Sequence, residues 1–474
     1  MLQDITERAI RLAQEIGCTY CDARFEFIER YGIVVENGQI EYTAKRYESG
    51  IGIRVLCDGA WGFFATSDQA KINQGITEAI KAAKHYALTK KTKVKLADIP
   101  INQKEITYKV KKQVCIDELN KISLECDRII RSGNDISKST VVASIVSNSK
   151  YFASSEGVRI RQTYSDVTMD LTATAHRGGL TQSINTTEGG RGGMEKILDE
   201  VDVLTVSKDI ACKAAKLLDA KPVKEDKATV VMNPDFVALL THEILGHPSE
   251  ADRVLGKEMA WAGGAWWAGK LGQKIGSNTL NVIDDPTMQG SLGWYEYDDE
   301  GTRSQRKQLV KNGILVNHMH SRETASIFDV KPNSSMRATS YSFMPLIRMA
   351  CTCIESGDWD PQEMIKDVKH GYLVSNMKVP SIDMQRYNWS ISCQYANKIE
   401  NGQVGELLRD VIIVGTAPEF FNSIDACGND FTVRPITNCG KGDPMQIMRM
   451  GNGGPSIRGI ATIKSTENEQ SRRH

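Results

Sequence analysis

The sequence lacks an excess of charge of either sign and lacks long apolar runs. Lysine plus arginine and aspartate plus glutamate number 59 each among 474 residues, so the formal net charge is zero. Such a balance gives no electrostatic reason to bind nucleic acid or an anionic membrane, and we expect neither as a partner. No run of about 18 apolar residues occurs, and the first residues contain no apolar signal core. We therefore expect a cytoplasmic protein.

The eleven cysteines lack the spacing of a disulfide framework. Their count is odd and most stand alone, which is typical of reduced thiols in a long chain. The one CxxC pair, Cys18 and Cys21, has no second pair and no thioredoxin-like setting. We interpret both as small buried side chains, and Cys351 and Cys353 in the same way.

Length and hydrophobic pattern predict an α+β protein of two domains. Residues 1–222 are expected to form an N-terminal domain of α/β type, with helices on a mixed or antiparallel sheet. Residues 223–474 are expected to form a mainly antiparallel β domain, barrel-like or a curved sheet, around one metal-binding helix. The charged connector 221–227 marks the boundary between them.

Within the first domain, periodicity predicts helices and a strand meander. The expected helices span 2–16, 68–87, 116–132 and 194–218, the last with a break near its middle. The meander is expected as four strands, 141–149, 151–155, 158–164 and 167–176. Four glycines in 188–193 favour a flexible loop.

Residues 241–248 read Thr-His-Glu-Ile-Leu-Gly-His-Pro. His242, Glu243 and His247 supply two imidazoles and a carboxylate, which suits a divalent metal with a base beside it. The string resembles the HExxH signature of zinc peptidases with one residue inserted, HExxxH. On an ideal helix, residues four apart are separated by about 40°, whereas residues five apart are separated by roughly 140°. Both histidines can therefore reach one metal only if the helix deforms or ends between them.

The flanking residues indicate how this helix begins and ends. Asn233 and Pro234 follow an expected strand, 227–232, and are a favoured N-cap and a favoured first helical residue. Gly246 tolerates unusual dihedral angles, and Pro248 disfavours a helical conformation in the residue before it. We expect the helix to end near Gly246 and His247 to turn back toward the metal.

Two histidines leave a catalytic zinc one protein ligand short, because such sites commonly use three ligands and a water. His318 and His320 lie two apart on an expected strand and share a face. Cys439 stands in a glycine-flanked loop near Lys441, a cation that would lower the pKa of its thiol. The carboxylate candidates are Glu250, Asp252, Asp284, Asp285 and Glu300. Residue chemistry alone leaves this choice open.

A set of motifs along the chain resembles the TldD/PmbA family, in its TldD-like zinc metallopeptidase branch. The set comprises 242–247 with Glu250 and Asp252, 298–302, 312–315, 348–349 and 439–442, together with 50–54 and 62–63 near the N-terminus. The resemblance spans nearly the whole chain. It departs from the family pattern where Asp443 and Pro444 follow Gly442, and in a tryptophan-rich stretch at 261–267.

The resemblance implies a function and a set of roles. It implies zinc bound by His242, His247 and Cys439, with Glu243 as general base. It implies hydrolysis of peptides or unfolded protein segments held in extended form. It also implies a dimer, either a homodimer or a heterodimer with a PmbA-like paralogue.

Several residues outside this core receive weaker assignments. Glu300 and Arg348 are candidates for substrate binding, Glu300 at a groove edge and Arg348 on a substrate carbonyl or terminus. The alternative for Arg348 is a buried structural ion pair. His318 and His320 have no counterpart in the family pattern and are interpreted as a polar strand face. The stretch 261–267 fits a flap that stacks on substrate and a packed core equally well.

Two other functions compete with peptide hydrolysis. One is a peptide-binding or complex-assembly protein whose metal is structural, with Glu250 closing a four-ligand site. The other is an amidohydrolase that applies the same zinc and water chemistry to a non-peptide substrate. Glu243 beside the first histidine favours a hydrolase over a structural site.

Overall fold

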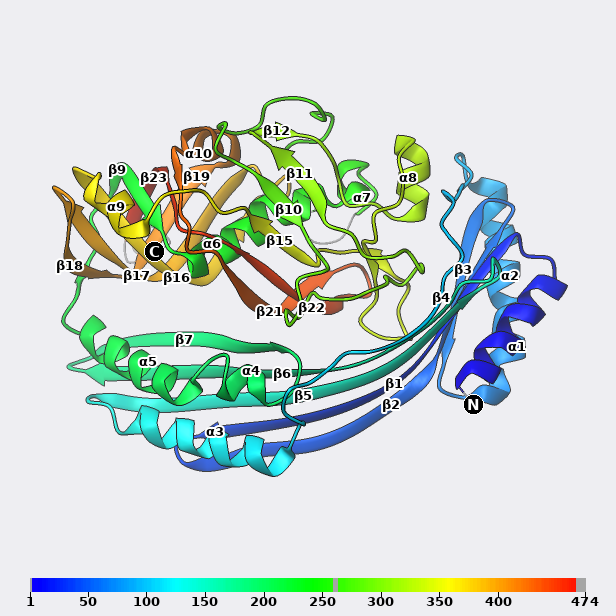
Figure 1. Ribbon diagram of the computed structural model, residues 1–474, viewed down its shortest axis with the longest axis horizontal. Coiled ribbons are helices and arrows are strands. Elements are labelled where there is room, and N and C mark those ends of the chain that lie inside the picture. Colours follow the sequence, from blue (N-terminus) through cyan, green and yellow to red (C-terminus); the bar gives the residue numbers. More distant parts are fainter. Residues whose placement is uncertain (1, 259–262, 466–474) are drawn as a thin grey trace.

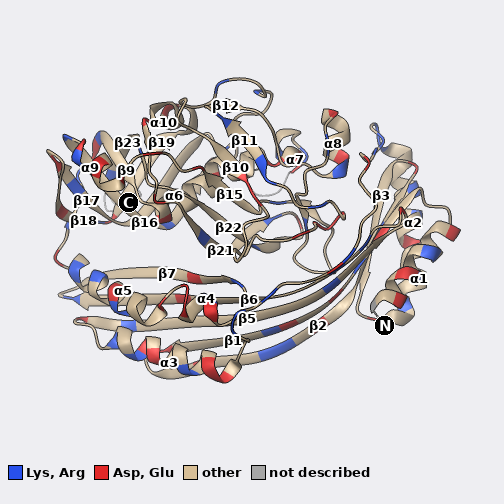
Figure 2. Ribbon diagram, in the orientation of Figure 1, with Lys and Arg blue, Asp and Glu red and all other residues tan. Residues whose placement is uncertain are grey.

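The computed structural model describes residues 2–258 and 263–465. The chain forms a long curved sheet flanked by helices and, against the other side of that sheet, a β-rich C-terminal part (Figure 1). Acidic and basic residues are interspersed over the helices of both parts, in keeping with the balanced charge (Figure 2). In the described residues, no helix combines the length and the apolar character that crossing a membrane requires. The α+β class predicted from the sequence is confirmed.

The N-terminal sheet has seven strands in the order β3-β2-β1-β5-β6-β4, with β7 paired to β6. Its strands are β1 Tyr20–Glu36, β2 Gln39–Cys57, β3 Ala60–Thr66, β4 Gln103–Thr107, β5 Ile136–Ser154, β6 Arg159–Arg177 and β7 Leu180–Arg191. The helices are η1 Gln69–Lys71, α1 Leu2–Glu15, α2 Ile72–Thr89, α3 Ile116–Arg131, α4 Glu195–Leu198 and α5 Val203–Leu217.

Alternation along these strands gives the sheet two different faces, because successive side chains point to opposite sides. Apolar residues of β1, β5 and β6 pack against α1 and α2 at one end and against α3 and α5 at the other. The opposite face carries buried polar side chains such as Asp22, Arg24 and Asp166. This polar face meets the C-terminal part.

Two expectations for this region need correction, and a third is confirmed. The four meander strands are two long ones, β5 and β6, because each continues through its apparent break in an unbroken antiparallel register. The stretch 188–193 is mostly strand, since β7 extends to Arg191. A Cβ on Gly189 or Gly190 would lie about 2 Å from a backbone oxygen, so these glycines permit close packing. The expected break in 194–218 is present between α4 and α5.

The C-terminal part contains a closed ring of five strands. β16, β9, β23, β19 and β17 pair in that order, and an added β16–β17 pairing closes the ring. β18 and β8 extend the same sheet from β17, and β20 pairs with β23. The strands of this sheet are β8 Lys221–Pro222, β9 Asp226–Met232, β16 His370–Ile382, β17 Asn388–Glu400, β18 Gln403–Arg409, β19 Val411–Thr416, β20 Ala426–Cys427 and β23 Ile457–Ser465.

A second, six-stranded sheet has the order β12-β11-β10-β15-β22-β21. Its strands are β10 Val282–Asp284, β11 Lys307–Lys311, β12 Ile314–Leu315, β15 Cys351–Ile354, β21 Thr432–Lys441 and β22 Gln446–Gly454, and β13 Met336–Arg337 pairs separately with β14 Leu346–Ile347. The helices are α6 Pro234–Leu240, η2 Thr241–Gly246, η3 His247–Ser249, α7 Ala251–Val254, α8 Arg322–Phe328, α9 Pro361–Lys366 and α10 Ala417–Ser423.

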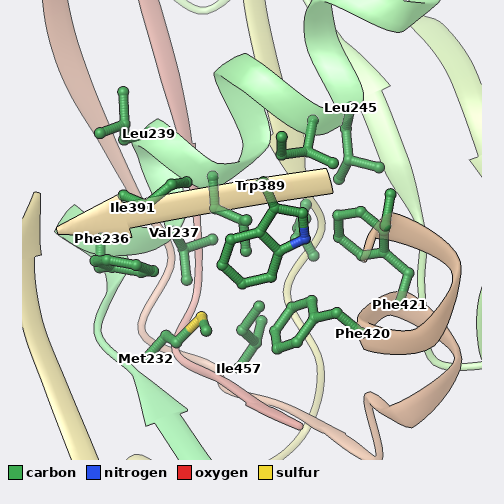
Figure 3. Close-up of a cluster of buried hydrophobic side chains, with 14 of the residues drawn as sticks. Met232, Phe236, Val237, Leu239, Leu245, Trp389, Ile391, Phe420, Phe421 and Ile457 are labelled. Carbon is green, nitrogen blue, oxygen red and sulfur yellow. The ribbon is translucent and has the colours of Figure 1, made fainter. Parts of the chain in front are cut away.

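The helix that carries the histidines packs on the largest core of the molecule. Phe236, Val237 and Leu245 meet Trp389 of β17 and Phe420 of α10 (Figure 3). Burying aromatic and branched side chains of this size stabilises the fold by about 2 kcal/mol each, so the helix has a rigid base. Trp266 and Trp267 are also buried in this core, which favours the core interpretation for that part of the tryptophan-rich stretch. Trp261 lies outside the described residues.

Ion pairs join the polar face of the N-terminal sheet to the C-terminal part. Arg54 pairs with Asp22 in its own sheet and with Glu300 across the interface, at 3.2 Å. Lys150 pairs with Asp299, and the Arg24 guanidinium donates to the Phe343 carbonyl at 2.6 Å. All of these side chains except Lys150 are nearly inaccessible to solvent. The interface is therefore held by charge pairs that need both parts in place.

Candidate metal centre

The two histidines lie on a π-helical turn. Asn233 caps α6 through the Phe236 amide, as expected, and the helix widens from Thr241 to Gly246. The His247 N–H donates to the His242 carbonyl, five residues back. In this i→i+5 geometry residues five apart stack on adjacent turns, so both imidazoles face the same side. The helix deforms and does not end at Gly246.

Two local expectations are corrected by this turn. His247 has φ −58° and ψ −42°, an ordinary helical conformation, and begins the short η3 helix. Pro248 follows in its first turn, where the missing N–H needs no partner. Gly246 also has helical dihedrals. Its role is steric, because a Cβ there would lie 2.0 Å from the Met349 sulfur.

His242, His247 and Cys439 come together in the interior. One ligand atom from each lies within 4.8 Å of the others, and all three residues are buried. The His247 Nε2 and the Cys439 Sγ are 3.5 Å apart, and the two imidazole rings meet edge to face with centroids 4.8 Å apart. Two imidazoles and a thiol at this spacing are a donor set that fits zinc.

The outer nitrogen of each imidazole has a fixed partner. The His242 Nδ1 lies 3.0 Å from the Asn452 Oδ1, and the Asn452 amide nitrogen donates to the Thr352 carbonyl. The His247 Nδ1 lies 3.1 Å from a carboxylate oxygen of Glu250. Both partners accept, so each imidazole carries its proton on Nδ1 and turns the Nε2 lone pair inward. The histidines are therefore held in the tautomer that metal binding requires.

Glu250 is a partner of a candidate ligand and not a member of the cluster itself. Its carboxylate also accepts from the Arg253 guanidinium at 2.7 Å and from the Lys441 ammonium at 3.1 Å. Burial opposes ionisation, but Lys441 and His247 hold the pKa of Glu250 well below its usual range. The sequence-based alternative in which Glu250 closes a four-ligand site is thus not the arrangement observed.

Cys439 reaches the histidines from β21, which pairs with β22 as a hairpin. The register shifts between Ile436 and Cys439, and such a bulge re-aims the side chains that follow it. The Arg348 guanidinium donates to the Cys439 carbonyl at 2.5 Å. Burial would raise the pKa of the Cys439 thiol, yet His242, Arg348 and His247 hold it well below the ordinary value. The thiolate is the form that binds metals.

Glu243 faces a cleft beside the cluster. The cleft has a volume of about 560 Å³ and is lined by both histidines, Glu243 and Cys439. Arg386 pairs with the Glu243 carboxylate and donates to the Glu243 carbonyl at 3.0 Å. Burial opposes ionisation of Glu243, but His242 and Arg386 lower its pKa to about 2. Glu243 is thus a carboxylate at neutral pH.

The remaining predicted candidates lie elsewhere. Glu300 is 2% exposed and binds Arg54 and the Arg322 amide, and Arg348 is fully buried on the carbonyls of Cys439 and Gln446. Neither lines the cleft. Arg348 makes no ion pair with any residue that the structure describes, so its contacts position the hairpin that carries Cys439.

The other ligand candidates also have partners of their own. Asp284 pairs with Lys307, Asp252 with Lys441, and Asp285 accepts from Thr287. His318 and His320 are buried near Phe328 and lie outside any strand, so the expected polar strand face is not what the structure has. In the described residues, the cluster of His242, His247 and Cys439 is the one group with metal-ligand spacing.

Two residues of the site were missed from the sequence. Asn452 is 210 residues from His242, and Arg386 is 143 residues from Glu243. Neither stands in a recognisable motif. Only the position of Asn452 between glycines, in Gly451-Asn452-Gly453, gave a local hint of close backbone packing.

The fold and the site together define a class of protein. A π-helical turn with two histidines and a cysteine of β21 form a buried cluster, with a carboxylate and a cleft beside it, against a long curved sheet. Sequence profiles of PmbA/TldA metallopeptidase domain 1, central domain and C-terminal domain match residues 21–87, 109–220 and 225–461. The chain belongs to the PmbA/TldD family of metallopeptidases.

Individual relatives agree with this assignment. A metalloprotease of Methanocaldococcus jannaschii is 31% identical over 95% of this chain and 97% of its own. A zinc metalloprotease TldD homolog of Saccharolobus solfataricus is 28% identical over the same shares, 95% and 97%. The crystal structure of TldE from Thermococcus kodakarensis has the same fold, with a TM-score of 0.77 and 19% identity over 97% of this chain and all of that one.

Proposed function

We propose that this protein is a zinc-dependent peptidase that hydrolyses peptides or unfolded protein segments bound in extended form. The observation that carries the proposal is the cluster of His242, His247 and Cys439 beside an ionised Glu243 that faces the cleft. The names of the relatives from M. jannaschii and S. solfataricus support it.

His242, His247 and Cys439 would hold the zinc. When bound, zinc acidifies a coordinated water and polarises a carbonyl. Glu243 follows His242 directly and faces the cleft, where its carboxylate would accept a proton from the attacking water and pass it to the leaving amine. Arg386 keeps that carboxylate ionised and pointed into the cleft. Glu250 and Asn452 accept from the Nδ1 of each imidazole and so leave each Nε2 available to a metal.

The walls of the cleft favour an extended substrate. β21 is the last strand of its sheet, and residues 435–440 of this strand line the cleft. An exposed strand edge can pair with an extended peptide through main-chain hydrogen bonds, with tolerance of many side chains.

The competing functions are weighed by the same contacts. A structural metal site needs a fourth ligand. The candidate, Glu250, lies outside the group with metal-ligand spacing, and its Oε2 is held by His247, Arg253 and Lys441. This supports a site with an open position.

The proposal also includes a domain boundary near residue 222, a cytoplasmic location, and a homodimer or a heterodimer with a PmbA-like paralogue. The fold shared with TldE supports the last of these.

Elemental analysis and peptide hydrolysis on the same samples test the proposal. We expect about one zinc per chain, lost in His242→Ala and Cys439→Ala. Glu243→Gln should keep its zinc and lose about 10²-fold or more in turnover, because a general base contributes at least that much. If Cys439→Ala keeps its zinc, the third ligand is wrong. If wild type holds zinc and cleaves no peptide, alone or mixed with a PmbA-like partner, the peptidase proposal falls.

A further inference from the structure

A second cavity lies beside the metal cleft, between the two parts of the molecule. It has a volume of about 330 Å³ and is enclosed by the polar face of the N-terminal sheet on one side and by residues of β13 and β22 on the other. Thr437 of β21 lines both cavities. β6 also runs along both, with Asp166 in this cavity and Asp170 in the metal cleft. Four residues of strand span about 13 Å, so an extended peptide of about four residues can connect the two.

The lining of this cavity is rich in cationic groups. It carries five of them, namely Arg30, Lys150, Arg191, Arg337 and Arg449, and three carboxylates. Two of the carboxylates are occupied, because Asp166 pairs with Arg191 and Asp299 pairs with Lys150. The third, Asp298, accepts three backbone N–H groups, and burial with the neighbouring Glu300 raises its pKa to about 7. Positive charge therefore exceeds negative charge here.

Two guanidinium groups in this lining have no carboxylate partner among residues 2–258 and 263–465. Arg337 donates to the carbonyls of Met349 and Arg449, at 2.7 and 2.9 Å. Arg449 donates to the Ser144 hydroxyl at 3.0 Å, and its Nη1 is buried with no hydrogen-bond partner. Burial lowers the pKa of both side chains. A buried guanidinium nitrogen without a partner is costly, and an anion in the cavity would satisfy it.

We propose that this cavity is a subsite that binds a carboxylate of the substrate peptide, with Arg449 as the principal contact and Arg337 positioning it. The inference rests on the peptidase function proposed above and specifies the substrate class. The carboxylate would lie about four residues from the bond that is cleaved, given the separation along β6. It comes from the C-terminus of a short peptide or from an acidic side chain, and the two sources are separable by experiment.

Three labelled peptides of one eight-residue sequence without other acidic residues test the ligand side. The first has a free C-terminal carboxylate, the second a C-terminal amide, and the third an amide with one glutamate near that end. Binding is measured by fluorescence anisotropy on full-length, zinc-loaded Glu243→Gln protein. We expect the amide to bind about 10-fold more weakly than the acid, as for loss of one charge-assisted hydrogen-bonded contact. If the glutamate peptide binds as tightly as the acid, any carboxylate near that end is sufficient. If it binds as weakly as the amide, the subsite requires the C-terminal carboxylate.

The Arg449→Gln change in the same background tests the protein side. We expect affinity for the acid to fall about 10-fold and affinity for the amide to stay the same. Arg11→Gln removes an equal charge from exposed α1 and should change neither. Equal binding of all three peptides to the unsubstituted subsite would overturn the inference. So would an equal loss for acid and amide in Arg449→Gln, because that pattern indicates a purely structural arginine.

Cleavage of the acid and amide peptides by wild-type protein separates this inference from the proposed function. Discrimination in binding without any cleavage would remove the peptidase proposal and leave a carboxylate-binding protein. Cleavage of both peptides with equal KM and equal kcat would leave the peptidase and remove the subsite.

Discussion

At the scale of single residues, the candidate metal centre depends on the imidazole nitrogens that face away from it and on their hydrogen-bond partners. Asn452 and Glu250 lie outside the ligand cluster, yet each accepts a hydrogen bond from one imidazole Nδ1. Outer partners of this kind fix the tautomer and ring orientation of metal-binding histidines. The Cys439 thiol is prepared differently, because its neighbours, His242 first and then Arg348, hold its pKa well below the ordinary value.

Replacement of Asn452 should weaken zinc binding without removing a ligand. We expect Asn452→Ala to lower zinc affinity about 10- to 100-fold, because the His242 Nδ1 loses its acceptor and the ring its fixed orientation. Competition with a chromophoric chelator measures the change. Asn452→Asp keeps an acceptor for His242 and serves as the matched control. A zinc affinity in Asn452→Ala equal to that of wild type would show that the ring is held by packing alone.

The sequence singled out the residues of the candidate cluster but not Asn452 and Arg386, which contact them. His242, Glu243 and His247 fall within six residues, so their spacing alone indicated a metal site. Asn452 and Arg386 are distant in sequence, and nothing local marks an asparagine or arginine as the partner of a particular side chain. Their roles depend on tertiary packing, which brings β22 and the β16–β17 connection to the helix.

At the scale of elements, the π-helical turn resolves the problem posed by the five-residue spacing. The sequence showed that an ideal helix could not bring both histidines to one metal. Gly246 and Pro248 suggested that the helix ended near Gly246. The wider turn instead keeps all residues helical. It is held by the His247 N–H to His242 carbonyl hydrogen bond and by the close packing of Gly246 on Met349. The residue types alone cannot distinguish a helix that ends from one that widens, because both arrangements are compatible with the same glycine and proline.

Addition of one methyl group at Gly246 should destabilise this turn. A Cβ would lie 2.0 Å from the buried Met349 sulfur, so Gly246→Ala should cost about 1–3 kcal/mol in the free energy of unfolding. Urea denaturation measures the loss. Gly405→Ala is the matched control, since a Cβ there would lie 3.7 Å from the Lys398 carbonyl oxygen, an ordinary van der Waals contact.

A double-mutant cycle with Met349→Ala assigns the cause of that loss. If the steric contact is responsible, Gly246→Ala should cost much less when Met349 is already alanine, with a coupling of about 1 kcal/mol or more. Additive losses would mean that Gly246 is required by the backbone and not by the contact.

At the scale of the whole molecule, the two parts share an interior of buried charges. Periodicity predicted helices on the N-terminal sheet, but the partners of the polar face of that sheet could not be read from the sequence. Arg54 and Glu300, for example, are 246 residues apart. Buried charges of this kind are strongly destabilising when one partner is removed, so the interface favours one relative placement of the two parts.

Two buried histidines, His318 and His320, should make the free energy of unfolding sensitive to mild acid. Burial lowers the pKa of His318 to about 4 and, with the charges of His318 and Lys307, the pKa of His320 to about 3. In the unfolded chain both titrate near 6.5. Above about pH 6.5 neither state binds these protons and stability is complete. Between about pH 6.5 and 4 only the unfolded chain binds them, so the free energy of unfolding falls as the pH falls.

Comparison of variants isolates this effect from the titration of other groups. His318→Leu should reduce the loss of unfolding free energy between pH 7 and 4.5 by on the order of 2 kcal/mol, since one of the two unfolded-state protonation sites is removed. His85→Leu removes a histidine exposed on α2 and should leave the loss as in wild type. Urea titrations at a series of pH values provide the measurement. The same pH slope in wild type and His318→Leu would mean that His318 is protonated inside the folded protein, where its unpartnered Nδ1 would then need an acceptor.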